Sequence, residues 1–260
     1  MSATTPVVQG APCWVSLITS DLRLAQDFYH GLLGWEFRPA FHRKEYVVAY
    51  KDGAPVAGIG ALARSMGFPV AWSPYFAVES ADKVSDRIRE RGATVAVGPI
   101  PFGPGRVAWA ADPMGAPFGI WEGYTEPEWP VRRGPGFPSW IELRTRDIFA
   151  ATIFYSEVLG WDTEPPERCD VRYTDEQVLV RIEGRTVGSL RGGALESAPD
   201  PRIRPRWHVY FCVEDVPAAA ERAAASGGEI VTPPEETHHG WESTLRDRQG
   251  GLFTVMSREN

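Results

Sequence analysis

The sequence is poor in cysteine, has no long apolar run and carries no excess of positive charge. Its three cysteines, Cys13, Cys169 and Cys212, are too few and too scattered for a disulfide framework or a zinc motif, which favours a reducing, cytoplasmic location. No apolar segment approaches the roughly 18 residues that a membrane-spanning helix needs. The formal net charge of −7 disfavours a broad phosphate-binding face. We therefore expect neither nucleic acid nor a membrane as a partner.

Sequence signatures of several enzyme classes and of export are also missing. The chain has no glycine-rich phosphate-binding loop and no nucleophile elbow, so no cofactor is expected. Residues 1–8 lack the charged and apolar regions of a signal peptide. The remaining composition is that of a folded protein, since 43% of the residues are apolar and 23% are charged, and 260 residues are enough for two domains.

An internal repeat determines the expected architecture. Residues 12–21 correspond to residues 138–147, and the match continues 126 positions apart through two Leu-Gly-Trp triplets at 33–35 and 159–161. A second set of matches lies 135 positions apart: Tyr75-Phe76 with Tyr210-Phe211, and Asp112 with Asp247. The change of offset means that the second copy carries nine extra residues between the two blocks, which we place between 191 and 206. The chain is therefore a tandem duplication.

A segment rich in proline and glycine joins the two copies. Residues 127–138 contain four prolines and two glycines, a composition typical of a linker with restricted flexibility. We therefore expect a first domain over residues 1–125, a linker over 126–136 and a second domain over 137–260.

Within each copy the hydrophobic pattern alternates between strand and helix periods. A strand at 14–18 is followed by a helix that begins after Asp21, an N-cap residue, and ends at Gly34, a left-handed C-cap. Two further strands, at 45–50 and 55–62, are joined by an Asp52-Gly53 hairpin turn. The pattern strand-helix-strand-strand-strand occurs twice in each copy. Two such modules are expected to curl their sheets into a half-open barrel with a central cavity, which is an α+β fold.

These motifs resemble the vicinal oxygen chelate superfamily, which includes glyoxalases, bleomycin-resistance proteins and extradiol dioxygenases. The resemblance rests on Phe28-Tyr29 in the first helix, the Leu33-Gly34-Trp35 ending and the turn at 112–115, and it covers residues 10–123 and 136–257. The tandem layout and the strand at 207–211 are most similar to two-domain glyoxalase-like bacterial proteins labelled as hydroxylases. The resemblance implies four βαβββ modules in two tandem domains with half-open barrel cavities.

The resemblance also implies where a metal would be bound, and the residues at those places do not suit one. Metal-dependent members use His or Gln on the first strand, His on the fifth and Glu on the eighth. The matching residues are Trp14, Ser73 and Gly119 in the first copy, and Trp140, His208 and Thr254 in the second. Only His208 ligates a divalent metal well, whereas a catalytic metal needs about three protein ligands. We therefore expect no metal site.

Glu142 and His208 are the candidate catalytic residues. Strand alternation places Glu142 on the same face as Trp140, and His208 on the same face as Tyr210, so both titratable groups can point into the second cavity. Three interpretations stay open at this stage. The two residues form a buried polar pair, a general acid–base pair or a metal site with two ligands.

Aromatic and small polar residues are the candidate ligand contacts. Trp14 and Trp140 occupy positions that face the predicted cavity, where each ring either packs or offers a stacking surface for an aromatic ligand. The full predicted ligand-binding set is Trp14, Ser73, Tyr75, Trp140, Tyr210 and Thr254. The basic run at 202–206 is either a solvated loop or an anchor for an anionic ligand, and His238 and His239 are most simply loop residues.

Taken together, the residues favour a protein that binds a small apolar or aromatic molecule in a cavity without a metal, for sequestration or in a natural-product-related role. The alternative is a metal-independent lyase, isomerase or hydroxylase-like enzyme that uses Glu142 and His208. A protein-interaction scaffold is supported only by the duplication. We expect a monomer or homodimer in which function is concentrated in the second copy, because only that copy has titratable groups at the cavity positions.

Overall fold

The computed structural model describes residues 8–40, 43–126, 129, 134–161, 169–192, 204–237 and 240–257. The first copy consists of β1 (Pro12–Ile18), α1 (Leu22–Leu33), β2 (Glu36–Ala40), β3 (Arg43–Lys51), β4 (Ala54–Gly60), α2 (Ala63–Met66), β5 (Ala71–Ala77), α3 (Ala81–Glu90), β6 (Thr94–Phe102), β7 (Gly105–Ala111) and β8 (Pro117–Glu122). The second copy consists of β9 (Pro138–Arg144), α4 (Ile148–Leu159), β10 (Cys169–Tyr173), β11 (Gln177–Ile182), β12 (Arg185–Arg191), β13 (Arg206–Cys212), α5 (Val216–Ala225), β14 (Glu229–Ile230), β15 (Glu235–Thr237), β16 (Gly240–Arg246) and β17 (Leu252–Met256).

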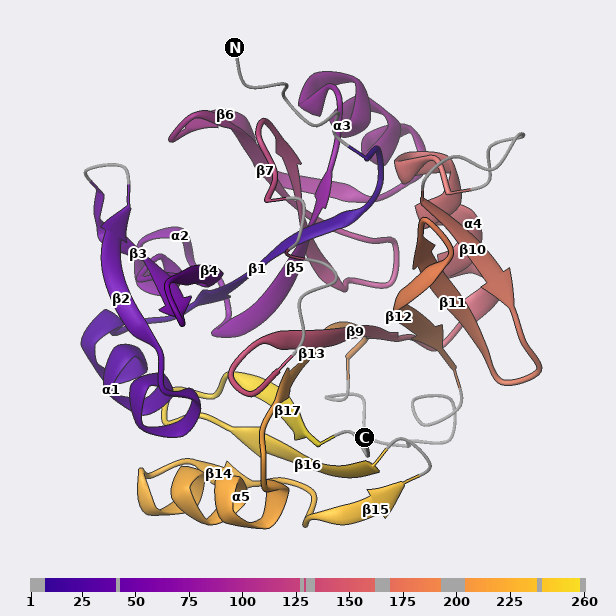
Figure 1. Ribbon diagram of the computed structural model, residues 1–260. Helices are drawn as coiled ribbons and strands as arrows, with labels where there is room; N and C mark the ends of the chain where they lie inside the picture. Colours follow the sequence, from indigo (N-terminus) through magenta and orange to yellow (C-terminus); the bar gives the residue numbers. More distant parts are fainter. Residues whose placement is uncertain are drawn as a thin grey trace. The chain divides into compact units, whose positions relative to one another are not determined.

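Each copy forms one sheet, and each sheet contains two βαβββ modules (Figure 1). The strand orders are β2-β3-β4-β1-β5-β8-β7-β6 and β10-β11-β12-β9-β13-β17-β16-β14, with β15 paired to β16. In every module the strand before the helix lies parallel to the last strand, as β1 does to β4 and β13 to β17. The predicted α+β class with four βαβββ modules is therefore confirmed. The sequence patterns did not predict β2 or α2.

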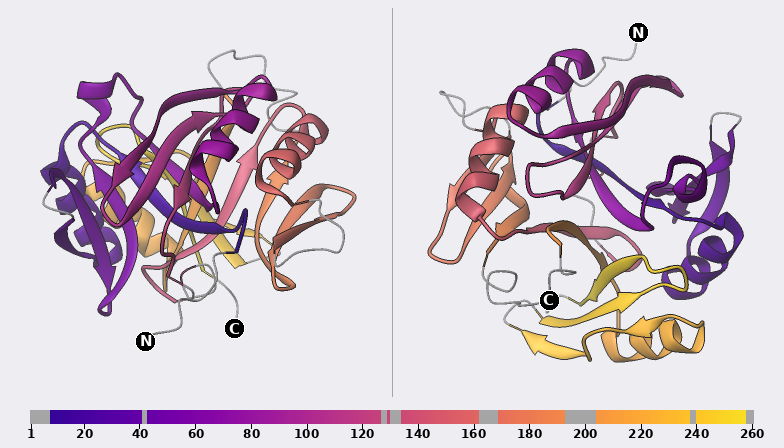
Figure 2. Two further views of the ribbon diagram at one scale, coloured as in Figure 1. Left: turned by 90° about the horizontal axis from the view of Figure 1, so that it is seen from above. Right: turned by 180° about the vertical axis from the view of Figure 1, so that it is seen from behind.

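The chain also divides into two compact units, and each unit combines one module from each copy. Unit 1 comprises Met1–Cys13, Pro74–Pro130 and Ile141–Trp207, and unit 2 comprises Trp14–Ser73, Val131–Trp140 and His208–Asn260. Helices α3 and α4 lie side by side within unit 1, and α1 packs beside α5 within unit 2 (Figures 1 and 2). Each unit contains segments from both sides of the predicted linker at 126–136. The predicted domain boundaries follow the sequence duplication, and they stay a prediction.

A buried chain of polar contacts forms the centre of unit 2. The indole Nε1 of Trp72 donates to the hydroxyl of Tyr29 at 2.9 Å, and this hydroxyl donates to Oδ2 of Asp247, also at 2.9 Å. The ring of Trp35 stacks on Tyr29 with the centroids 5.6 Å apart. Burial, and then the nearby charge of Asp247, raise the pKa of Tyr29 well above its usual range. The tyrosine therefore remains a neutral hydrogen-bond donor at neutral pH.

Unit 1 contains the duplicate of this polar chain. Trp207 Nε1 donates to Tyr155 at 2.9 Å, Tyr155 donates to Asp112 Oδ2 at 3.2 Å, and the ring of Trp161 stacks on Tyr155 at 5.7 Å. Burial raises the pKa of Asp112, although hydrogen bonds to its carboxylate oppose this shift. In both units the tyrosine comes from one copy and the aspartate from the other. Each copy thus completes the core of a module that belongs to its duplicate.

Local sequence signals explain where helix α1 begins and ends and where the chain turns between β3 and β4. Asp21 caps α1 by accepting from the backbone N–H of Leu24 at 3.1 Å, and Gly34 ends the helix with a φ of 68°. The turn between β3 and β4 has positive φ at both Asp52 and Gly53, as a tight hairpin with right-handed strand twist requires. The predicted caps and the predicted hairpin turn are confirmed.

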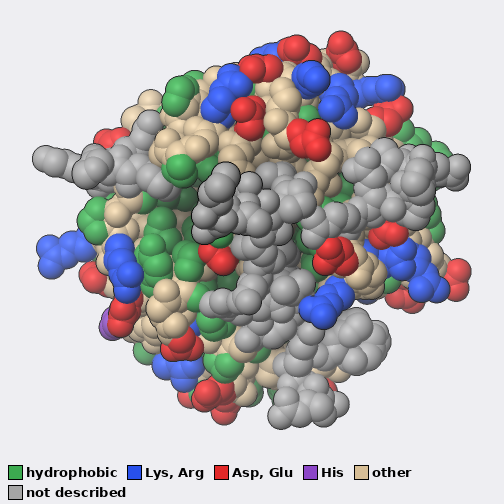
Figure 3. Space-filling view, turned by 45° about the horizontal axis from the view of Figure 1, so that its top comes forward, with side chains coloured by type: hydrophobic (Ala, Val, Ile, Leu, Met, Phe, Trp, Pro, Cys, Tyr) green, Lys and Arg blue, Asp and Glu red, His purple; other side chains and the backbone are tan. Residues whose placement is uncertain are grey.

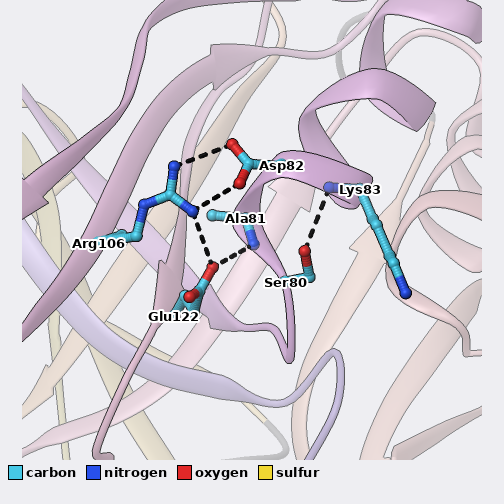
Figure 4. Close-up of polar contacts among 6 residues, drawn as sticks. All are labelled: Ser80, Ala81, Asp82, Lys83, Arg106 and Glu122. Carbon is cyan, nitrogen blue, oxygen red and sulfur yellow. Dashed lines mark hydrogen bonds and ion pairs between the residues drawn. The ribbon is translucent and has the colours of Figure 1, made fainter.

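A network of charged side chains fixes the start of α3. Glu122 accepts from the backbone N–H of Ala81 at 2.7 Å, and Arg106 makes a two-pronged contact with Asp82 at 2.6 and 2.9 Å (Figure 4). The hydrogen bond from Arg106 lowers the pKa of Asp82, whose negative charge also lies favourably in the first helical turn. Since Asp82 is exposed, water and salt screen this contribution.

The hydroxyls of Thr19 and Thr145 supply a prediction about stability. The two residues are equivalent in the two copies, both are buried, and neither side-chain oxygen has a hydrogen-bond partner within the described part of the chain. A buried hydroxyl without a partner costs roughly 1–3 kcal/mol of desolvation, which an isosteric methyl group avoids. We expect Thr19→Val and Thr145→Val to leave the free energy of unfolding unchanged or to raise it, as measured by urea denaturation. A loss above 2 kcal/mol from either variant would show that the hydroxyl is satisfied.

Candidate functional site

The candidate site lies on the faces of the sheets that are turned away from the helices. In the last module, Phe211 and Phe253 pack against each other on the helix side, whereas His208, Tyr210 and Thr254 point to the opposite side. His208 Nε2 and Thr254 Oγ1 are 2.6 Å apart, and the rings of His208 and Tyr210 meet edge to face. All three residues are buried. The structure therefore brings together the three predicted residues that belong to this module.

The same face of the first module carries an aromatic cluster that the sequence analysis identified only in part. Trp14 Nε1 donates to the hydroxyl of Tyr46 at 3.3 Å, and Ser16 Oγ lies 3.0 Å from the same hydroxyl. A Cβ at Gly58 would lie 1.8 Å from the tyrosine oxygen, so only glycine leaves room for it. Burial raises the pKa of Tyr46, which keeps its hydroxyl protonated at neutral pH. Tyr46 was missed, although its place in the strand predicted at 45–50 was a usable signal.

The second module places another ring where the resemblance implied a metal ligand. A Cβ at Gly119 would lie 2.3 Å from Cδ1 of Tyr75, so the tyrosine ring occupies the space in front of this glycine. Trp109 Nε1 donates to the hydroxyl of Tyr75 at 2.6 Å. Trp109 was also missed by the sequence analysis. Ser73, two residues before Tyr75, is buried in unit 2.

The other candidate catalytic residue, Glu142, lies in the third module. It is buried on β9, and its Oε1 accepts from Nε of Arg144 at 2.7 Å. Glu142 belongs to unit 1 whereas His208 and Trp140 belong to unit 2, and the proposed Glu142–His208 pair stays a prediction.

The donor set does not fit the metal that the fold family implies. Within the described residues, no group of three or more His, Cys, Asp or Glu side chains is arranged to hold a metal ion. At the predicted positions, Tyr75 fills the space beside Gly119, and the hydroxyl of Thr254 is engaged with His208 and, at 3.0 Å, with Thr244. One imidazole with neutral hydroxyls around it is not a site for a catalytic divalent cation.

The remaining predicted features are either structural or outside the described residues. Trp35 and Trp161 are buried core residues, as predicted. Burial raises the pKa of Cys13 and Cys169, so neither thiol is activated. Nδ1 of His30 lies 2.8 Å from the carbonyl oxygen of Trp35. The predictions for His238, His239 and the first two residues of the basic run at 202–206 lie outside the described residues.

One face of the described surface carries charged side chains of both signs. Figure 3 shows Lys and Arg side chains interspersed with Asp and Glu on the visible face rather than gathered into one basic field. No described helix is both long enough and apolar enough to span a membrane.

Comparison with known proteins identifies the family. A model described as a glyoxalase-like domain matches residues 140–256. The protein CFP32 of Mycobacterium tuberculosis (strain CDC 1551 / Oshkosh), whose name describes it as a glyoxylase, is 30% identical over 257 residues, which is 95% of each chain. The chain belongs to the vicinal oxygen chelate superfamily. The anthracycline biosynthesis protein DauV of Streptomyces sp. (strain C5) is a further relative, 32% identical over 97% of this chain and 94% of its own.

Solved structures of this superfamily share the fold. A Mn(II)-bound glyoxalase from Novosphingobium aromaticivorans superposes with a TM-score of 0.59 at 17% identity, covering 96% of this chain and 82% of its own. An extradiol ring-cleaving dioxygenase from B. fuscum gives a TM-score of 0.60 at 15% identity, covering 100% and 75%. At such identities the likeness concerns the fold alone, because one fold hosts several chemistries in this superfamily.

Proposed function

We propose that the protein binds a small aromatic or largely apolar molecule against the helix-free faces of its sheets, and that it does so without a catalytic metal. The observation that carries this proposal is the replacement of ligating residues by rings and small groups. Where metal-dependent relatives need ligands, this chain has Trp14 and Trp140, and it has Gly119 covered by the ring of Tyr75. Flat aromatic surfaces with a few fixed polar groups suit an aromatic ligand.

The polar groups on these faces support recognition rather than metal binding. The hydroxyls of Tyr46 and Tyr75 are each held by an indole N–H, so their orientations are fixed before a ligand arrives. Relatives of the chain are named for anthracycline biosynthesis, and a role with natural products of this kind is the context that we propose here. None of the three cysteines, all of which the structure describes, forms a disulfide bond, and this favours a reducing cytoplasm as the location.

The first test uses N-phenyl-1-naphthylamine, an uncharged aromatic fluorophore, together with elemental analysis. We expect saturable binding that is unchanged by EDTA, and far less than one zinc, iron or manganese per chain. Trp140→Ala is expected to weaken binding about tenfold, since stacking on a large ring contributes on the order of 1–2 kcal/mol. Trp241→Ala is the matched control, because that tryptophan is exposed on β16.

The outcomes of this test separate the alternatives. About one metal per chain, whose removal abolishes binding, would contradict the metal-free proposal. Equal effects of the two tryptophan variants would contradict a stacking role for Trp140.

A metal-independent lyase, isomerase or hydroxylase-like enzyme is the second candidate function. It is favoured by the burial of two titratable residues, Glu142 and His208, on helix-free faces of the second copy. In this function they are the acid–base pair, with the carboxylate and the imidazole as the groups that transfer protons. Loss of turnover with retained ligand binding in His208→Gln would distinguish this enzyme from a binder.

A further inference from the structure

Two arginines lie next to each other at the ends of neighbouring strands in unit 1. Strands β9 and β12 are parallel, and their register pairs Ser189 with Glu142 and Arg191 with Arg144. Paired residues on adjacent strands project to the same side of a sheet, and so do residues two apart on one strand. All four side chains therefore share the helix-free face. Arg144 and Arg191 are the last residues of β9 and β12.

Arg144 is held by an ion pair, whereas the positive charge of Arg191 is only weakly balanced. Arg144 donates to the buried Glu142 at 2.7 Å, and its side chain is 31% exposed. Arg191, 44% exposed, has among the described residues a single ion pair, at 3.9 Å to the largely exposed Glu176. An exposed ion pair at this distance contributes on the order of 0–1 kcal/mol and is readily exchanged for a better partner. The planar guanidinium of Arg191 is thus available for a ligand.

A neighbouring hydroxyl adds a second, independent observation. Ser189 is fully buried on β12, two residues before Arg191, and its Oγ has no hydrogen-bond partner within the described part of the chain. Buried polar groups without partners are rare in folded proteins, and a donor in this state is suited to an incoming acceptor. The hydroxyl lies on the same face as the two arginines, about 7 Å from Arg191 along the strand.

The first copy shows that the fold does not require these charges. In its sheet the corresponding pairs are Ser16 with Gly58 and Ile18 with Gly60, none of which is charged. The same positions of the same module type are therefore uncharged in one copy and carry a carboxylate and two guanidinium groups in the other. The charged group is a property of the second copy, where the sequence analysis also placed function.

We propose that Arg144, Arg191 and Ser189 bind the anionic group of an aromatic ligand, which is a carboxylate, sulfonate or phosphate. This inference rests on the proposed function and specifies the class of ligand. Arg191 provides a two-pronged contact to the anion, Ser189 donates a further hydrogen bond, and Glu142 holds Arg144 in place.

The test compares two fluorophores with the same ring skeleton. 8-Anilinonaphthalene-1-sulfonate carries one sulfonate, and N-phenyl-1-naphthylamine is its uncharged counterpart. We expect the sulfonate to bind the wild-type protein at least tenfold more tightly. Arg191→Gln should raise its Kd about tenfold and Ser189→Ala about fivefold, while both leave the Kd of the uncharged probe within twofold.

Arg185→Gln is the matched control, because Arg185 is an exposed arginine at the opposite end of β12. It removes the same charge and should change neither Kd by more than twofold. Equal affinities of the two probes, or equal effects of the two arginine variants, would overturn the anion site while leaving the proposed function intact. If neither fluorophore binds, the proposed function fails and the anion site fails with it. Ser189→Ala should not lower the melting temperature, since its hydroxyl has no partner to lose.

Discussion

Replacing Asp247 by alanine is expected to lower the free energy of unfolding by about 3–5 kcal/mol, because it removes one acceptor from three donors and each buried donor left unsatisfied costs about 1–3 kcal/mol. Its Oδ1 accepts from the backbone N–H groups of Gln249 and Gly251 at 2.8 and 2.9 Å, and its Oδ2 accepts from Tyr29. Alanine would leave two turn amides and a buried tyrosine hydroxyl without this acceptor. Urea denaturation followed by tryptophan fluorescence measures the loss.

The duplication supplies the matched comparison for this experiment. Asp112→Ala removes the equivalent contacts to Met114, Ala116 and Tyr155 in unit 1, and we expect a similar loss. Asp86→Ala, at an exposed position of α3, should change the free energy of unfolding by less than about 0.5 kcal/mol. A loss below 1 kcal/mol in both buried variants would mean that the Trp–Tyr–Asp chains do not stabilise the units.

Much of the local structure could be predicted because it depends on neighbouring residues. Asp21, Gly34 and the Asp52-Gly53 turn each act within a few positions of the chain, and the structure confirms all three. Strand β2 was missed because Pro39 interrupts a short and largely exposed segment, which is a weak strand signal. The four-residue helix α2 is too short for a periodic pattern.

The exchange between the copies could not be predicted from the repeat. Offsets of 126 and 135 positions establish that Tyr29 matches Tyr155 and Asp112 matches Asp247. They do not say whether a tyrosine bonds the aspartate of its own copy or that of the other. That choice depends on how modules pack, and the structure shows the crossed arrangement. The sequence therefore defined the modules but not their partners.

The candidate site was predicted with a similar limit. Strand alternation alone is enough to put Arg144 on the same face as Glu142, yet nothing in one strand reveals that Arg191 lies beside it. That proximity comes from the parallel register of β9 and β12, which are separated by a helix and two strands. Tyr46 reaches Trp14 in the same way, across β4. Contacts between residues from distant segments can be inferred only once the order of the strands in the sheet is known.

Substitutions of His208 should separate a structural role from a functional one. His208→Ala removes a buried ring and the contact with Thr254, and we expect a loss of about 2–4 kcal/mol in the free energy of unfolding. His208→Gln keeps a polar group of similar reach beside Thr254 and should stay close to the wild-type melting temperature. If the second copy carries function, the glutamine variant should nevertheless raise the Kd for N-phenyl-1-naphthylamine at least fivefold.

Trp14→Phe is the control in the first copy, because it keeps an aromatic ring and removes only the hydrogen bond to Tyr46. We expect its Kd for the same probe to stay within twofold of the wild-type value, since phenylalanine keeps an aromatic stacking surface at this position. Equal losses of affinity from Trp14→Phe and His208→Gln would show that the two copies bind alike. Unchanged affinity in His208→Gln would remove the second copy as the favoured site and leave His208 as a residue that stabilises β13 and β17.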